Sequence, residues 1–277
     1  MTVYRNKVDL QSEDWDGLVD THCHLDLEPL HSRLTDVLSE ARRVGVTSFI
    51  VPGVHPDGWE RMSSLPRQHR GVFLAFGIHP MHADTADEST LQRLAVYASH
   101  GVAIGEIGLD PSCAIPMDRQ ERAFRDQLRL AVARNLPVLV HCRRAFRRTL
   151  RVLSEEGASR VGGIMHAFSG SLEMAHEFIR LGFTIGLCGT VTWENALRPV
   201  RLAREIPLES LVLETDAPDL APRPFRGQPN HPGLLVHVLE AVARARAVPP
   251  REVAQATGNT SQRILKRLRT GFSANLW

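Results

Sequence analysis

The chain has few cysteines and no long apolar run. Four cysteines occur among 277 residues, at positions 23, 113, 142 and 188, and none forms a Cys-x-x-Cys pair. This usage excludes a disulfide scaffold and is typical of a reducing compartment. No run of about 18 apolar residues is present, and the charged segment 1–15 lacks the apolar core of a signal peptide. We therefore expect a cytoplasmic protein with no membrane contact and no obligate protein partner.

Lysine and aromatic residues are scarce as well. The 33 basic residues include only two lysines, Lys7 and Lys266, and aromatic residues make up 6% of the chain. The formal net charge is +2, so any contact with nucleic acid must come from a local patch rather than from an overall field. Few aromatic side chains mean few surfaces for base stacking. This favours a short substrate bound at its end over a long bound strand.

Short apolar runs alternate with amphipathic segments along the chain. At 43% hydrophobic and 23% charged residues, the composition excludes disorder, collagen-like repeats and a coiled coil. The apolar runs cover residues 18–20, 48–51, 72–76, 102–104, 138–140, 163–165, 184–185 and 211–213. The segments between them have helical spacing, which predicts parallel strands joined by helices. Eight such units, with no Gly-x-Gly-x-x-Gly after any strand, favour a single (β/α)8 TIM barrel over a doubly wound sheet.

The barrel is expected to span residues 18–277, preceded by an N-terminal extension over residues 1–17. Apolar positions in 234–242 predict one helix after the last strand, and residues 253–268 predict an additional C-terminal helix. The proline-rich stretch 218–232 predicts a long ordered loop after the eighth strand.

Residues that bind metals follow several of the predicted strands. In such a barrel, residues past the C-terminal ends of the strands converge on one face. His22 and His24 end the first strand, and residues two apart in an extended chain point the same way. Any one of these residues alone is more often a cap or a satisfied polar group, but their joint placement predicts a metal site. The full set of candidate ligands is His22, His24, Glu106, His141, His166 and Asp216.

Six ligands exceed what one tetrahedral zinc requires, so we expect two divalent ions that share a carboxylate. Glu106 is the candidate bridge, because both lysines lie outside the strands and a carboxylated lysine is thereby excluded. Asp216 is expected to complete the first site, to hold the bridging water and to accept its proton. Mixed histidine and carboxylate ligation is compatible with Mg²⁺, Mn²⁺ or Zn²⁺.

Seven motifs between residues 19 and 265 occur in a recognisable order. They are Asp20-Thr21-His22-Cys23-His24-Leu25-Asp26, Gly77-Ile78-His79-Pro80, Ile104-Gly105-Glu106-Ile107-Gly108-Leu109-Asp110, His141-Cys142-Arg143-Arg144, His166-Ala167-Phe168-Ser169-Gly170, Leu213-Glu214-Thr215-Asp216-Ala217-Pro218 and Gly227-Gln228-Pro229-Asn230. In these motifs the sequence resembles the TatD family of metal-dependent hydrolases, and in particular its YjjV-like branch. Arg144 and Ala167 depart from the commoner family pattern, which has an acidic residue and a cysteine at these positions.

The resemblance implies a TIM-barrel hydrolase with a two-metal centre. It assigns one ion to His22, His24, Glu106 and Asp216, and the other to Glu106, His141 and His166. It also implies hydrolysis of ester bonds, as in a TatD-like deoxyribonuclease that acts as a 3′-to-5′ exonuclease on DNA ends. Glu106 and Asp216 are then the catalytic residues.

Three residues are candidates for binding the substrate. Arg143 stands beside His141 among the arginines that open the helix after the fifth strand, at positions 143, 144, 147, 148 and 151, where a helix N-terminus and guanidinium groups favour phosphate. His79 ends the third strand and could donate to a phosphate or a leaving oxygen. Asn230 resembles a family position near the substrate.

Two other functions fit the same ligand set. The first is hydrolysis of a different ester, as in an aminoacyl-tRNA deacylase or a small-molecule phosphoesterase. The second is a non-catalytic scaffold that retains a metal site, although such a protein would be expected to lack a ligand.

Overall fold

The computed structural model describes residue 15 and residues 17–268. Of the expected N-terminal extension, only Trp15 and Gly17 fall in this range, and residues 269–277 of the expected barrel domain lie outside it, so these domain bounds stay a prediction. The buried Trp15 indole donates a hydrogen bond of 3.0 Å from Nε1 to the carbonyl of Val44, which follows the first long helix.

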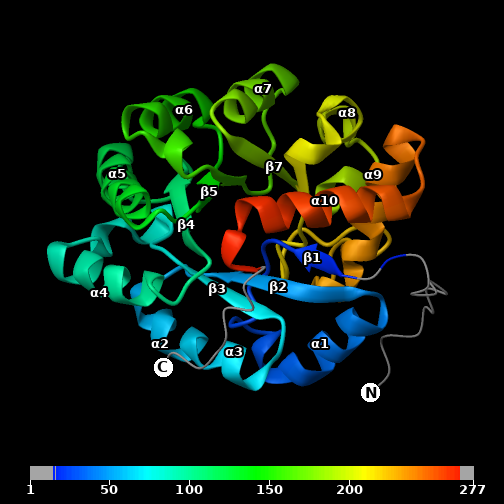
Figure 1. Cartoon of the computed structure of the whole chain (residues 1–277), viewed down its shortest axis with the longest axis horizontal. Helices are drawn as coiled ribbons and strands as arrows, with labels where there is room; N and C mark the ends of the chain where they lie inside the picture. The colour runs from blue at the N-terminus through cyan, green and yellow to red at the C-terminus, as the bar shows by residue number, and fades with distance from the viewer. Residues whose placement is uncertain (1–14, 16, 269–277) are drawn as a thin grey trace.

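Eight parallel strands form one sheet in sequence order and curve into a barrel with helices outside it (Figure 1). They are β1 (Leu18–Asp20), β2 (Val46–Pro52), β3 (Val72–Phe76), β4 (Ala103–Leu109), β5 (Val138–Cys142), β6 (Gly163–Met165), β7 (Phe183–Leu187) and β8 (Leu211–Leu213). The predicted (β/α)8 barrel is confirmed. Several predicted bounds are wrong: β2, β5 and β7 extend one or two residues beyond the predicted runs. The largest difference is in β4, which continues to Leu109 rather than ending at Ile104, because it stays paired with β5 as far as the Leu109–Cys142 register.

Single hydrogen bonds and one isolated β-bridge, rather than a continuous ladder, close the barrel between β8 and β1. The amide of Thr21 donates to the carbonyl of Leu213 at 3.1 Å, and Cys23 forms a parallel bridge with Ala217. The buried Asp20 carboxylate accepts from the Thr215 amide at 2.9 Å and from the Thr215 hydroxyl at 2.6 Å. A side chain therefore joins the first strand to the segment that follows the last one.

The helices pack their apolar faces on the outside of the strands. They are α1 (Leu34–Arg43), α2 (Trp59–Ser63), α3 (Leu65–Gln68), α4 (Glu88–Ala98), α5 (Met117–Arg134), α6 (Phe146–Glu155), α7 (Leu172–Arg180), α8 (Leu197–Glu205), α9 (Leu235–Arg246) and α10 (Pro250–Ile264). Among the residues described, none of the helices is both long and apolar enough to cross a membrane.

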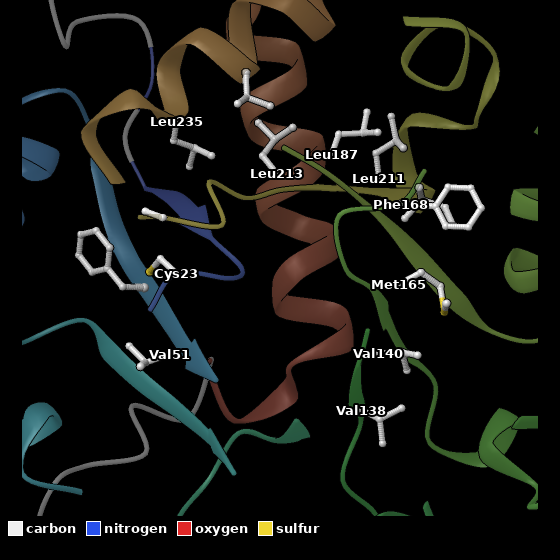
Figure 2. Packing of buried hydrophobic residues seen from close by; sticks show 14 of the residues in the cluster. Cys23, Val51, Val138, Val140, Met165, Phe168, Leu187, Leu211, Leu213 and Leu235 are labelled. Atoms are coloured by element: carbon white, nitrogen blue, oxygen red, sulfur yellow. The ribbon is translucent and has the colours of Figure 1, made fainter. Parts of the chain in front are cut away.

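The strands contact two apolar clusters, one outside the barrel and one inside it. The larger cluster lies between strands and helices, where Figure 2 shows Val138, Val140 and Met165 on neighbouring strands. The smaller cluster fills the barrel and includes Ile50, Leu139 and Val212 from the strands together with Ile264 and Leu265 from the end of α10. The predicted additional C-terminal helix is thus confirmed.

Helix α10 closes the mouth of the barrel at which the strands begin. Arg263 and Thr260 both donate to the carbonyl of Glu209, just before β8, at 2.7 and 3.0 Å. In Figure 1 α10 crosses the barrel close to β1. The opposite mouth, where the strands end, is where the candidate ligands gather.

Candidate metal centre

The six predicted ligands meet at the mouth where the strands end. His22 and His24 follow β1, His166 follows β6 and Asp216 follows β8, whereas His141 lies in β5. Glu106 lies in the middle of β4 rather than at its end. All except His141 and Asp216 are buried, and these two are partly accessible.

One oxygen of Glu106 faces the histidines of β1. Its Oε2 lies 3.2 Å from Nε2 of His22 and 3.8 Å from Nε2 of His24. Oδ1 of Asp216 completes this group at 3.8 and 3.7 Å from the same two nitrogens. Four ligand atoms, from His22, His24, Glu106 and Asp216, thus surround one small space.

The other oxygen of Glu106 faces a different set of histidines. Its Oε1 lies 2.7 Å from Nδ1 of His141, 3.7 Å from Nε2 of His79 and 3.8 Å from Nε2 of His166. Nε2 of His166 also lies 3.5 Å from Oδ1 of Asp216, and the His166 ring stacks on that of His22 at 3.5 Å between centroids. His166 therefore lies between the two groups, while His79, expected only as a substrate contact, lies in the second.

The unsatisfied polar atoms of this cluster fit a metal centre. Both ring nitrogens of His22 are buried and have no hydrogen-bond partner among the residues described, although Nε2 is close to Glu106. A buried polar atom without a partner is costly. Ligand atoms at about 2.1 Å from a shared ion would lie about 3.4 Å apart. The distances of 3.2 to 3.8 Å around His22 and His24 fall in this range.

Charge and burial act in opposite directions on these groups. Burial disfavours protonated His166, but the carboxylates of Glu214, Asp216 and Glu106 outweigh it and raise the pKa of His166 to about 10. For His141, the hydrogen bonds with Asp110 and Glu106 likewise outweigh burial, and its pKa rises to about 9. Burial raises the pKa of Asp216 to about 6. Without an ion, His166 and His141 therefore hold protons at neutral pH. Their positive charges offset the carboxylates, as bound metal ions would.

Two carboxylates behind the ligands were not predicted as site residues. Oδ2 of Asp110 lies 3.2 Å from Nε2 of His141, and Oε1 of Glu214 lies 3.1 Å from Nδ1 of His166. A carboxylate on the far ring nitrogen fixes the orientation and tautomer of a histidine ligand. Their positions just after β4 and β8 were the available signal in the sequence.

Backbone strain gathers at the same place. Arg144, Ala167 and Asp216 have φ values of +54°, +40° and +57°. Side chains other than glycine rarely adopt this region, and such residues cluster at functional sites. Two of the three, Arg144 and Ala167, are the positions that depart from the commoner family pattern.

The three residues expected to bind the substrate differ in their exposure and in their hydrogen bonds. Arg143 is exposed, and its guanidinium donates one long hydrogen bond of 3.4 Å to the Ser112 hydroxyl. His79 accepts a hydrogen bond at Nδ1 from the Met81 amide, which leaves Nε2 facing Glu106. Asn230 is fully buried and donates to the carbonyls of Thr215 and Asp219 at 2.8 and 2.7 Å. Its amide thus holds the loop after β8.

The basic stretch at the start of α6 divides into two parts. Arg148 and Arg151 form ion pairs with Glu121 of α5. Their charge is thus neutralised within the protein and is not available to a ligand at the metal centre. Arg143 and Arg144, before the helix, and Arg147, in its first turn, are exposed. Of the five arginines, these three remain as candidates for binding an anion.

Comparisons with known proteins identify related chains over nearly the whole barrel. The family model described as TatD related DNase matches residues 19–266. The chain is 36% identical to the uncharacterized metal-dependent hydrolase YabD of Bacillus subtilis, over 90% of this chain and 99% of YabD. It superposes on the crystal structure of YjjV, a TatD homologue from Escherichia coli, with a TM-score of 0.85 and 34% identity over 89% of this chain and 97% of YjjV. It is also 35% identical to a protein of Cronobacter sakazakii named 3′-5′ ssDNA/RNA exonuclease TatD, over 83% of this chain and 90% of that protein.

Proposed function

Because the chain belongs to the TatD family of metal-dependent hydrolases, we propose that it hydrolyses phosphodiester bonds with two divalent ions and removes nucleotides from the 3′ ends of DNA. The observation that carries this proposal is the placement of Glu106. Its two oxygens face two separate groups of ligand atoms, as a carboxylate shared by two ions must. The Cronobacter relative named as an exonuclease supports the choice of substrate.

The residues fit a division of the ligands around Glu106. His22, His24 and Asp216 would hold one ion with Oε2 of Glu106, and His141 and His166 would hold the other with Oε1. When bound, Mg²⁺, Mn²⁺ or Zn²⁺ ions lower the pKa of water and neutralise charge on a phosphoryl group. Asp110 and Glu214 orient His141 and His166 for this task.

Asp216 is the residue that accepts a proton from the attacking water. Its Oδ1 faces the histidines, so Oδ2 is the oxygen left to take the proton. Its backbone has a left-handed conformation, with φ of +57°. Without an ion, burial raises the pKa of this carboxyl to about 6.

Arg143 and His79 are the residues that contact the substrate phosphate. Arg143 is exposed beside His141 and can form charge-assisted hydrogen bonds with phosphate oxygens. Nε2 of His79 points at the Glu106 side of the centre, from which it reaches the leaving oxygen. Asn230 acts through the loop that it holds.

A single assay tests this function. Single-stranded DNA labelled at either end is incubated with the protein and Mg²⁺, Mn²⁺, Zn²⁺ or a chelator, alongside the Glu106→Ala variant. We expect stepwise shortening from the 3′ end that is lost with chelator and in the variant. Because the Cronobacter protein is named for both nucleic acids, the same assay includes RNA.

Intact DNA and RNA with every metal, although the metals bind, would contradict the nuclease proposal. Aminoacyl-tRNA and small phosphodiesters would then be tested as substrates of the same centre. Bound metal without hydrolysis of any of these esters would indicate a scaffold.

A further inference from the structure

A pocket of about 550 Å³ lies at the start of the loop that follows Asp216. Pro29 from the segment after β1, Trp193 from the segment after β7, and Pro218, Asp219 and Arg226 from the loop after β8 contribute to its lining. Pro218 lies two residues beyond Asp216, and the amide of Asp219 donates to the carbonyl of Asp216 at 2.8 Å. The pocket and the candidate general base therefore share one short segment of backbone.

The wall of this pocket is built from two loops that are fastened together. Nε1 of Trp193 donates to the carbonyl of Ala221 at 3.0 Å, and the amide of Arg223 donates to the hydroxyl of Thr192 at 2.8 Å. Gly189 allows this approach, since a Cβ atom there would lie 2.0 Å from the carbonyl oxygen of Leu220. The indole of Trp193 is thus fixed in place before any ligand binds.

Arg226 lies over this indole. Its guanidinium carbon is 4.4 Å from the centroid of the Trp193 ring, and its side chain is exposed. Within the described part of the chain, no carboxylate forms an ion pair with Arg226, whereas Arg223 on the same loop pairs with Glu194. Arg226 therefore presents a planar cation whose charge is available to an anionic ligand.

The chemistry of the pocket fits a nucleoside with its phosphate at the rim. Nucleobases stack on aromatic rings and on arginine guanidinium planes, and this stacking tolerates any base. Asp219 lines the same pocket, and its negative charge disfavours a phosphate inside it. A neutral base and sugar in the pocket avoid repulsion by Asp219. The phosphate, placed between Arg226 and the metal centre, is attracted by the guanidinium.

We propose that the pocket between Trp193, Arg226 and Pro29 binds the 3′-terminal nucleoside of the substrate, which stacks on the Trp193–Arg226 pair while Arg226 contacts its phosphate. This subsite rests on the proposed phosphodiesterase function and gives it a substrate class, a nucleotide 5′-diester. It accounts for action at a chain end, because one nucleoside fills the pocket beside the centre.

Two chromogenic diesters with the same leaving group test the subsite. Thymidine 5′-(4-nitrophenyl phosphate) carries a nucleoside, and methyl 4-nitrophenyl phosphate carries none. We expect Trp193→Ala and Arg226→Gln to lower kcat/KM for the thymidine diester by about 5- to 150-fold, the range of one base-stacking contact. In Trp193→Ala, turnover of the methyl diester should change less than about twofold, because this substrate makes no stacking contact to lose. Arg226→Gln should lower it as well, because the methyl diester keeps the phosphate that Arg226 contacts, but by less than it lowers turnover of the thymidine diester.

Arg223→Gln is the matched control, because Arg223 is an exposed arginine on the same loop whose charge Glu194 neutralises. It should change neither substrate. Trp193→Phe keeps an aromatic face and should recover most of the loss on the thymidine diester. In Trp193→Ala, equal losses on both diesters, or no loss on either, would overturn the subsite.

Failure of the proposed function gives a different result. If the wild-type protein cleaves neither diester with any metal, the phosphodiesterase proposal fails. Binding of thymidine 5′-monophosphate to the metal-loaded protein, followed by tryptophan fluorescence, then decides on the pocket. Quenching that disappears in Trp193→Phe and weakens in Arg226→Gln supports the subsite, and identical titrations of all variants contradict it.

Discussion

Nε2 of His22 and Oε2 of Glu106 lie 3.2 Å apart inside the barrel and are not hydrogen-bonded to each other. Both atoms are buried, and in water-excluded surroundings two such groups would be expected to share a proton or an ion. Oδ1 of Asp216 likewise lies 3.8 and 3.7 Å from Nε2 of His22 and of His24. These distances favour an ion held between the side chains over direct hydrogen bonds between them.

Replacing the shared carboxylate should remove activity and metal together. Glu106→Gln keeps the shape of the side chain but loses the charge that both groups of ligands face. Since outer partners of a metal site already contribute about 10- to 100-fold, we expect a loss of more than about 100-fold in kcat/KM. Metal content by mass spectrometry should fall as well. Glu60→Gln, an exposed position on α2, is the control, and normal metal content in Glu106→Gln would refute the bridge.

Removing the carboxylate behind His141 should weaken metal binding without abolishing it. Asp110 faces Nε2 of His141 through Oδ2 and accepts two bonds from Ser112 through Oδ1. Asp110→Ala should lower metal affinity about 10- to 100-fold. Asp110→Asn, which keeps an acceptor oxygen, should lose less. Equal affinities for wild type and Asp110→Ala in a competition titration with a chelating dye would show that Asp110 does not orient the ligand.

The positions of these outer carboxylates show where prediction from sequence ended. The gathering of the candidate ligands was predictable because His22, His24, His166 and Asp216 follow apolar runs, and strand ends converge in a barrel. Asp110 and Glu214 also follow strands, but a lone carboxylate there has the same pattern as a helix cap. Only the approach of β4 to β5 and of the loops after β6 and β8 brings them to His141 and His166.

The end of β4 and the ion pairs of two arginines were also missed, because both depend on contacts between elements. Gly105, Glu106 and Gly108 interrupt the apolar pattern, so the sequence predicts an end at Ile104, whereas pairing with β5 continues to Leu109. The pairing of Arg148 and Arg151 with Glu121 depends on α5 and α6 lying side by side. Neither relationship is encoded in local spacing.

Metal binding should release protons at neutral pH. The pKa values of His166 and His141, about 10 and about 9 without an ion, mean that both imidazoles hold protons at pH 7. A ligand nitrogen must lose its proton, so affinity should rise with pH up to these pKa values and fall as the pH is lowered. Calorimetric titrations in buffers with different ionisation enthalpies count the protons released. A binding enthalpy that is independent of the buffer would contradict the prediction.

The closure of the barrel should depend on Asp20. Its buried carboxylate accepts from the amide and hydroxyl of Thr215, and burial raises its pKa to about 7. Asp20→Ala leaves these buried donors without an acceptor, so the free energy of unfolding should fall by about 2 kcal/mol or more. Asp20→Asn retains one acceptor and should lose less. Urea unfolding of the metal-free proteins measures both, and equal stability of Asp20→Ala and wild type would show that the closure does not need this side chain.

Anomalous diffraction from crystals grown with Mn²⁺ tests the two-metal centre most directly. We expect two anomalous peaks on opposite sides of the Glu106 carboxylate, one among His22, His24 and Asp216 and the other beside His141 and His166. A single peak, or a second peak away from Glu106, would contradict a shared carboxylate and the two-metal mechanism built on it.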